Sequence, residues 1–171
     1  MEDASADRFQ RVLTQTVGGR LRVVRGQNLL YRIPVEPDLT IPVDPAHPSR
    51  GDNAFQTDLM IVENRGGLML PRVVFEMKPG ITSHDVLVYA AKARQHKHVY
   101  PWLRYGLVAM RKATVPGRAL THREGLDFIL APQGLKGAAL QSMVRRLVLA
   151  EVRASRQLRI HVRRQGHRRG D

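Results

Sequence analysis

The sequence predicts an α/β fold in which a central mixed β-sheet is flanked by helices. Apolar, strand-like segments alternate along the chain with segments whose apolar residues recur at helical spacing. The 171 residues are 43% hydrophobic, which is enough for one core, whereas two full domains would need a longer chain. We therefore expect one domain over residues 1–162. The remaining residues, 163–171, contain no apolar side chain and predict a flexible basic tail.

The first third of the chain predicts a helix followed by a long loop. Phe9, Val12 and Leu13 recur at helical spacing, and Gly18 and Gly19 should end that helix. Residues 34–53 contain five prolines, which disfavour regular structure. We expect this segment to be a surface loop.

The middle of the chain predicts an antiparallel strand pair followed by a helix. Residues 54–62 and 73–78 have the pattern of buried strands, and Asn-Arg-Gly-Gly at 64–67 is typical of a turn. A helix should begin at Thr82 or Ser83 and end near Tyr100, before Pro101. Two further strands, at 105–110 and 127–131, and a last helix over 136–161 complete the expected elements.

The charge of the chain predicts a polyanionic partner. Lysine and arginine number 28 against 15 aspartates and glutamates, for a net charge of +13. Such a charge attracts nucleic acid first and an anionic membrane surface second. The absence of cysteine excludes a thiolate nucleophile and a sulfur-ligated zinc site. The acidic start of the chain and the absence of a long apolar run predict a cytoplasmic protein with no membrane partner.

Three charged residues in the predicted strand pair suggest a metal site. Alternate residues of a strand share a face, so Glu76 and Lys78 should point the same way, opposite Phe75 and Met77. Burying unpaired charges costs several kcal/mol, so these groups must pair with each other, with Asp58 or with a ligand. Asp58 opposite Glu76 would supply two carboxylates for Mg²⁺, with Mn²⁺ as a substitute. Such an ion activates water for phosphodiester hydrolysis, and an adjacent ammonium can orient that water.

This pattern resembles a known nuclease motif. Asp58, seventeen intervening residues and then Glu76-Met77-Lys78 on a strand followed by a helix resemble the PD-(D/E)XK nuclease superfamily, which includes type II restriction endonucleases, resolvases and repair nucleases. The resemblance covers residues 54–112, about a third of the chain. It implies a restriction-endonuclease-like core in which Asp58, Glu76 and Lys78 are catalytic. It also implies that Asp58, Glu76 and the backbone carbonyl of Met77 bind the metal.

The helix after the motif should contribute to the same site. Some members of the superfamily add a glutamine or lysine from this helix, which implies a supporting catalytic role for Gln95, three residues after Lys92 on one face. We expect His96 and His98 to be solvated and to face phosphate. Three basic residues of the helix should line the substrate groove, although an exposed charged face would give the same pattern: Lys92, Arg94 and Lys97.

The last helix should be apolar on one side and basic on the other. Arginine forks bind phosphate oxygens in bidentate fashion, so DNA-backbone binding is one interpretation. A solvated basic face or a dimer contact is the other. The predicted DNA-binding arginines of this helix and of the tail that follows are Arg145, Arg153, Arg156, Arg159, Arg163 and Arg164.

Together these features favour a Mg²⁺-dependent DNA endonuclease of the restriction type. Cutting both strands with so small a chain would call for a homodimer with two sites. One alternative is a structure-selective repair or recombination nuclease. Another is a DNA-binding protein without activity, in which Glu76 and Lys78 form an ordinary ion pair and Asp58 caps a turn.

Overall fold

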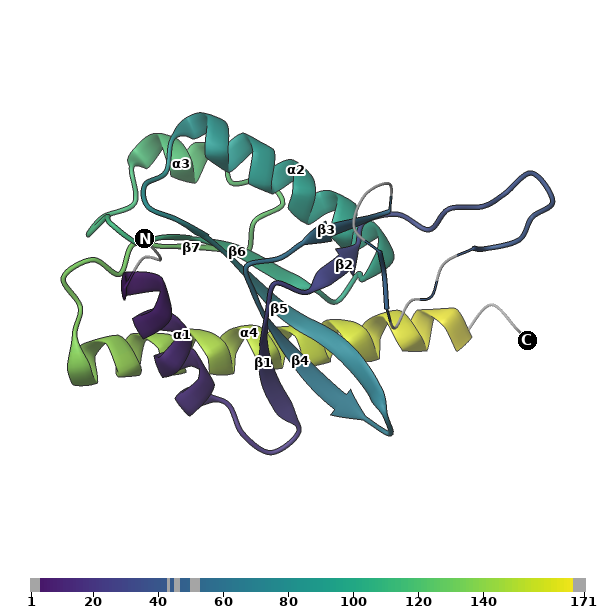
Figure 1. Ribbon diagram of the computed structural model, residues 1–171, viewed down its shortest axis with the longest axis horizontal. Coiled ribbons are helices and arrows are strands. Elements are labelled where there is room, and N and C mark those ends of the chain that lie inside the picture. The colour runs from purple at the N-terminus through teal and green to yellow at the C-terminus, as the bar shows by residue number, and fades with distance from the viewer. Residues whose placement is uncertain (1–3, 43, 45–46, 50–52, 168–171) are drawn as a thin grey trace.

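The computed structural model describes residues 4–42, 44, 47–49 and 53–167 (Figure 1). A mixed sheet of five strands lies between two layers of helices, which confirms the predicted fold class. The elements in chain order are α1 (Ala4–Thr16), β1 (Leu21–Arg25), β2 (Asn28–Leu30), β3 (Ala54–Gln56), β4 (Leu59–Arg65), β5 (Leu68–Lys78), α2 (Ser83–Val99), β6 (Arg104–Ala109), α3 (Gly117–Thr121), β7 (Phe128–Leu130) and α4 (Gly137–His167).

The sheet has the strand order β1-β4-β5-β6-β7. Strands β1, β4 and β5 are antiparallel neighbours, and β5, β6 and β7 run parallel. Helices α1 and α4 cover one face, and α2 and α3 cover the other (Figure 1). Because β5 is covered on both faces, Val73, Val74 and Phe75 are completely buried. A continuous run of apolar residues is expected for a central strand of this kind.

One predicted strand is divided in two. Residues 54–62 form β3, which pairs with β2 in a separate small sheet, and β4, which belongs to the main sheet. The division falls at Thr57 and Asp58, because the Thr57 amide and hydroxyl both donate to the Gln27 carbonyl oxygen, at 2.9 and 3.0 Å. Asp58 therefore lies immediately before β4.

The last helix is longer than predicted. α4 continues to His167, so residues 163–167, where the sequence predicted the start of a flexible basic tail, are helical. Arginine and glutamine are good helix formers, and cations near a helix C-terminus interact favourably with its dipole. Residues 168–171 of the predicted tail lie outside the described residues.

Helix α2 begins where the sequence predicts, and a capping box holds its start. The Thr82 hydroxyl accepts from the Asp85 amide at 3.2 Å, and the Asp85 carboxylate accepts from the Thr82 amide at 2.9 Å. The helix begins five residues after the end of β5 and runs back over the sheet to the start of β6 (Figure 1). Side chains from its middle can therefore reach the last residues of β5.

The described residues of the proline-rich segment, 34–42, 44 and 47–49, lie outside helices and strands, as predicted, and residues 34–42 lead away from the body of the molecule (Figure 1). Within the described part of the chain, no helix has the length and apolar character needed to cross a membrane.

Candidate functional site

The structure brings Asp58 and Glu76 together at the end of β5. Leu59, the first residue of β4, pairs with Phe75, so Asp58 falls beside Glu76 on the adjacent strand. The Met77 amide donates to Asp58 Oδ2 at 2.7 Å, which fixes this carboxylate against β5. Asp58 therefore contacts the strand of Glu76 and caps no turn.

Glu76 is a buried carboxylate with 2% of its surface exposed. Its Oε1 atom accepts hydrogen bonds from the Tyr105 hydroxyl and from Lys92 Nζ, the latter at 3.4 Å. Burial raises the pKa of Glu76, and the nearby Asp58 charge adds to this effect, whereas Lys92 and Tyr105 lower it; the net pKa is above the usual value. The negative charge of Glu76 is thus only partly compensated.

Lys78 ends β5 and does not pair with Glu76. Its Nζ atom lies 5.3 Å from the centre of the Tyr89 ring. A hydrogen bond with Tyr89 raises the pKa of Lys78, outweighing burial, and the charges of Asp85 and Asp58 act in the same direction. Lys78 is therefore an ammonium at neutral pH.

The two carboxylates fit a hard divalent cation such as Mg²⁺. Both hydrogen bonds to Glu76 end on Oε1 and the bond to Asp58 ends on Oδ2, so Oε2 and Oδ1 accept no hydrogen bond from any described residue. Carboxylate oxygens with uncompensated charge are the donors that Mg²⁺ prefers, with water completing its octahedron. Among the described residues, no cluster of three or more histidines, cysteines and acids could hold a metal ion. The protein would therefore contribute the two carboxylates of this site and, by the resemblance, the Met77 carbonyl.

The sequence did not predict that two tyrosines belong to the site. Tyr105 on β6 donates to Glu76, and Tyr89 on α2 contacts Lys78 and Lys92. A tyrosine in an otherwise apolar strand signals that its hydroxyl needs a partner, but nothing local identifies Glu76 as that partner. Lys92, which the sequence predicted to contact DNA, provides a cation beside Glu76.

Gln95 and His96, the α2 residues next to Lys92, do not lie where the sequence predicted. Gln95 is exposed, and the α2 side chain that reaches Glu76 is that of Lys92. The prediction that His96 is solvated is wrong, because His96 is completely buried. Its Nδ1 donates to the Leu30 carbonyl oxygen at 2.8 Å, and its ring stacks on Tyr105. Burial lowers the pKa of His96 to about 4, so its ring is neutral at pH 7.

Several basic residues predicted to bind DNA contact the protein itself. Lys97 pairs with Asp127 at 2.8 Å, and Arg156 pairs with Glu63 at 3.1 Å. Arg159 lies 5.8 Å from the centre of the Trp102 ring. The predicted residues that remain exposed are Arg94, Arg145, Arg153, Arg163 and Arg164.

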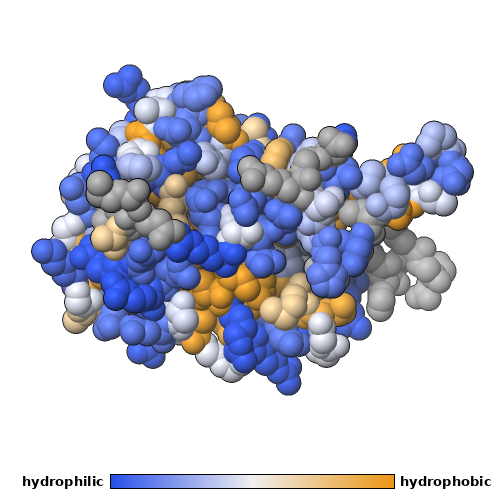
Figure 2. All heavy atoms as spheres, in the orientation of Figure 1, coloured by the Kyte–Doolittle hydropathy of each residue, from blue (hydrophilic) through white to orange (hydrophobic). Residues whose placement is uncertain are grey.

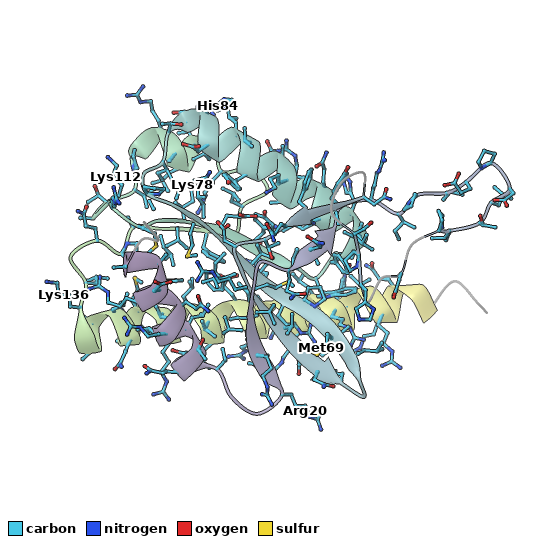
Figure 3. The ribbon with its side chains drawn as sticks, in the orientation of Figure 1. Arg20, Met69, Lys78, His84, Lys112 and Lys136 are labelled. Atoms are coloured by element: carbon cyan, nitrogen blue, oxygen red, sulfur yellow. The ribbon has the colours of Figure 1, made fainter. Side chains whose placement is uncertain are left out.

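A basic rim surrounds the end of the sheet where β5 and β6 finish, here called the site end. The Met110 amide donates to the Lys78 carbonyl oxygen at 2.7 Å, which joins the loops after these two strands. Lys112 and Lys136 are exposed at this end, where Lys78 is half-buried (Figure 3). Neither Lys112 nor Lys136 belongs to the predicted motif, and their proximity to Lys78 depends on the tertiary fold.

No protein-family model matches the chain, and no curated protein matches it either. Because one fold supports many activities, the function must be inferred from the chemistry of the site.

Proposed function

We propose that the chain is a Mg²⁺-dependent nuclease that hydrolyses phosphodiester bonds in DNA. The observation that carries this proposal is the pair Asp58 and Glu76, in which the buried carboxylate has a raised pKa. Perturbed buried acids are concentrated at functional sites, and two adjacent carboxylates with an ammonium nearby suit metal-assisted hydrolysis.

Each residue of the site has a role in this proposal. Asp58, Glu76 and the Met77 carbonyl would hold the ion. When bound, the ion would lower the pKa of a coordinated water and neutralise charge on the phosphate. Tyr105 fixes the orientation of Glu76 through its hydroxyl. The Lys78 ammonium, kept charged by Tyr89, would donate to a phosphate oxygen or orient the attacking water.

The wider surroundings of the site support a DNA substrate. Lys112 and Lys136 would bind backbone phosphates beside the reacting one. The order β4, turn, β5, α2, β6 is the order of elements on which the resemblance to the PD-(D/E)XK superfamily depends. By that resemblance the protein would be a cytoplasmic endonuclease of the restriction type, and cutting both strands would require a homodimer.

One observation favours the inactive DNA-binding alternative. Lys92 Nζ already lies 3.4 Å from Glu76 Oε1 and supplies a positive charge inside the site. If this ion pair satisfied Glu76 completely, the acids would be structural and the basic surface alone would bind DNA. The two functions differ in whether a metal ion is required.

Incubation of the protein with supercoiled plasmid and Mg²⁺ separates these functions. We expect nicked or linear products from the wild type, and none from Asp58→Ala, Glu76→Ala or Lys78→Ala. Glu124→Ala, which removes an exposed acid elsewhere, should cut normally. Full cleavage by Asp58→Ala, or no cleavage by the wild type with either Mg²⁺ or Mn²⁺, would contradict the proposal.

A further inference from the structure

A second surface lies far from the candidate site. Residues 31–42, called the arm, extend from β2 away from the body of the molecule (Figure 1). Apolar side chains interrupt the hydrophilic surface of this projection (Figure 2). Four large apolar residues of the arm are exposed: Ile33, Val35, Leu39 and Ile41. Leu39 is 81% exposed, the highest value among the large apolar residues described. Clustered apolar exposure of this kind marks an interaction surface.

Local hydrogen bonds hold the tip of the arm in one conformation. The Leu39 amide donates to the Glu36 carbonyl oxygen at 2.8 Å, and the Glu36 amide donates to the Thr40 carbonyl oxygen at 2.9 Å. Asp38 Oδ1 accepts from the Thr40 hydroxyl at 2.7 Å. Leu39 has a φ of 68°, a left-handed conformation that is uncommon for leucine. The tip therefore holds the exposed Leu39 on a hydrogen-bonded turn.

The charge of the arm points to a basic protein surface as its partner. The arm contains Glu36 and Asp38 against Arg32, a net charge of −1, and its two acids both lie near the tip. DNA phosphates would repel this segment. The arm also lies at the opposite end of the molecule from Lys78 (Figure 3). Its binding partner should combine apolar side chains with positive charge.

The protein itself carries such a surface. An open groove of about 700 Å³, called the α4 groove, lies between Arg104 and the C-terminal half of α4. Its lining includes Leu158 and Ile160, which are 37% and 53% exposed, and Arg164. The residues that line the groove include two arginines, Arg104 and Arg164, and no acid. The groove thus offers both the apolar contacts and the positive charge that the arm requires.

We propose that the arm of one chain docks in the α4 groove of a second copy, forming an arm-exchanged homodimer. The arm and the C-terminal half of α4 lie at the same end of the molecule (Figure 1). A two-fold axis at that end would bring each arm onto the other copy, and the two contacts would be identical. Leu39 would pack against Leu158 and Ile160, and Glu36 would face Arg164. This proposal does not depend on nuclease activity.

Disulfide cross-linking tests the contact directly, because the chain has no cysteine of its own. A mixture of Leu39→Cys and Ile160→Cys proteins should form a covalent dimer much faster than a mixture of Leu39→Cys and Leu120→Cys. Leu120 lies on α3 and, at 49%, is about as exposed as Ile160. Equal cross-linking rates in the two mixtures would overturn the proposal.

Charge reversal separates this interface from other uses of the arm. Glu36→Arg and Arg164→Glu should each weaken the dimer at least about tenfold in sedimentation equilibrium, and the double variant should restore it. Asp58→Ala should remain dimeric, so failure of the nuclease proposal leaves this result unaffected. A wild type that is monomeric at about 100 times the protein concentration of the cleavage assay would contradict the proposal. A Glu36→Arg variant that bound DNA more tightly but kept the dimer mass of the wild type in sedimentation equilibrium would also contradict the proposal.

Discussion

At the scale of single residues, the carboxylate of Glu76, proposed to bind a metal ion, lowers the stability of the fold. Its carboxylate is buried and its pKa is raised, so ionisation is less favourable in the folded chain than in the unfolded one. Lys92 and Tyr105 reduce this cost without removing it. Active sites commonly retain destabilised groups of this kind because the chemistry requires them.

Replacement of Glu76 by glutamine should therefore stabilise the metal-free protein at neutral pH. Below the unfolded pKa of about 4.5 both states of the wild type are protonated, and the two proteins should melt alike. As pH rises toward the raised pKa of the folded state, only the unfolded chain ionises, and the wild type loses stability relative to Glu76→Gln. Melting temperatures from pH 4 to pH 8 measure this difference, with roughly 2–4 °C expected per kcal/mol. A glutamine variant less stable than the wild type at pH 8 would show that Lys92 fully compensates the charge.

At the scale of elements, the sheet depends on a close approach between β6 and β7. Gly106 lies opposite Phe128 in this parallel pair. A Cβ atom at Gly106 would overlap the Phe128 ring, which itself packs against Phe75 in the core. The missing side chain is therefore what allows the ring to occupy this position.

Gly106→Ala should destabilise the fold by about 1–3 kcal/mol, because the Phe128 ring must move to accommodate the methyl group. Urea unfolding measures the loss. Gly117→Ala is the matched control, since a Cβ there meets no atom within 4 Å and alanine favours the helix. Equal unfolding midpoints for the two variants would contradict this account of the β6–β7 contact.

A buried ion cluster links β4, β5 and α4. Glu63 and Arg72 are 2% and 1% exposed and pair at 2.7 Å, and Arg156 joins them from α4. Burial alone would raise the pKa of Glu63, but Arg156 and Arg72 outweigh it and lower the pKa below the usual value. The stabilisation from Glu63 is therefore present above the unfolded pKa and is lost as pH falls through the lowered folded pKa.

Glu63→Gln should cost about 3–5 kcal/mol at pH 7, because it leaves the buried Arg72 charge without its partner. Arg65→Gln, which removes a half-exposed member at 3.4 Å from Glu63, should cost at most about 1 kcal/mol. Chemical unfolding of both variants at pH 7 tests this contrast. If the two variants lost similar amounts of unfolding free energy, the buried Glu63–Arg72 pair would not be what holds the cluster together.

At the scale of the whole molecule, charge is divided between two ends. Lys78, Lys112 and Lys136 gather at the site end, and the acidic arm lies at the other (Figure 3). The C-terminal half of α4, with five arginines over residues 153–164, lies at the same end as the arm, so the lysines of the site end form one of two basic surfaces.

Lys112→Gln combined with Lys136→Gln should weaken DNA binding for all sequences and reduce its salt dependence. The slope of log affinity against log salt should fall by roughly 0.9 for each phosphate that these lysines neutralise in the wild type. Fluorescence anisotropy at several KCl concentrations measures the slope. Arg20→Gln combined with Arg22→Gln removes the same charge near β1 and should change the slope less. A larger change in that control would place DNA elsewhere on the surface.

Local signals in the sequence predicted much of this architecture. Thr82, Asp85 and Pro101 define α2 within a few neighbouring residues, and strand alternation with the turn at 64–67 brings Asp58 toward Glu76. Partners supplied by distant segments could not be predicted. Tyr105 reaches Glu76 only through the register of a parallel strand. The basic pattern of the helices gave no sign that Asp127 and Glu63 would pair with Lys97 and Arg156.

The central claim is that Asp58 and Glu76 together hold a divalent cation, and thermal unfolding with and without ions tests it most directly. Mg²⁺, Mn²⁺ and Ca²⁺ should each raise the melting temperature of the wild type, by the equivalent of about 2.7 kcal/mol at 100 times Kd. The shift should grow with pH as Glu76 loses its proton. Asp58→Ala should show no shift with any ion. Identical melting of the wild type and Asp58→Ala, with and without each ion, would contradict the claim.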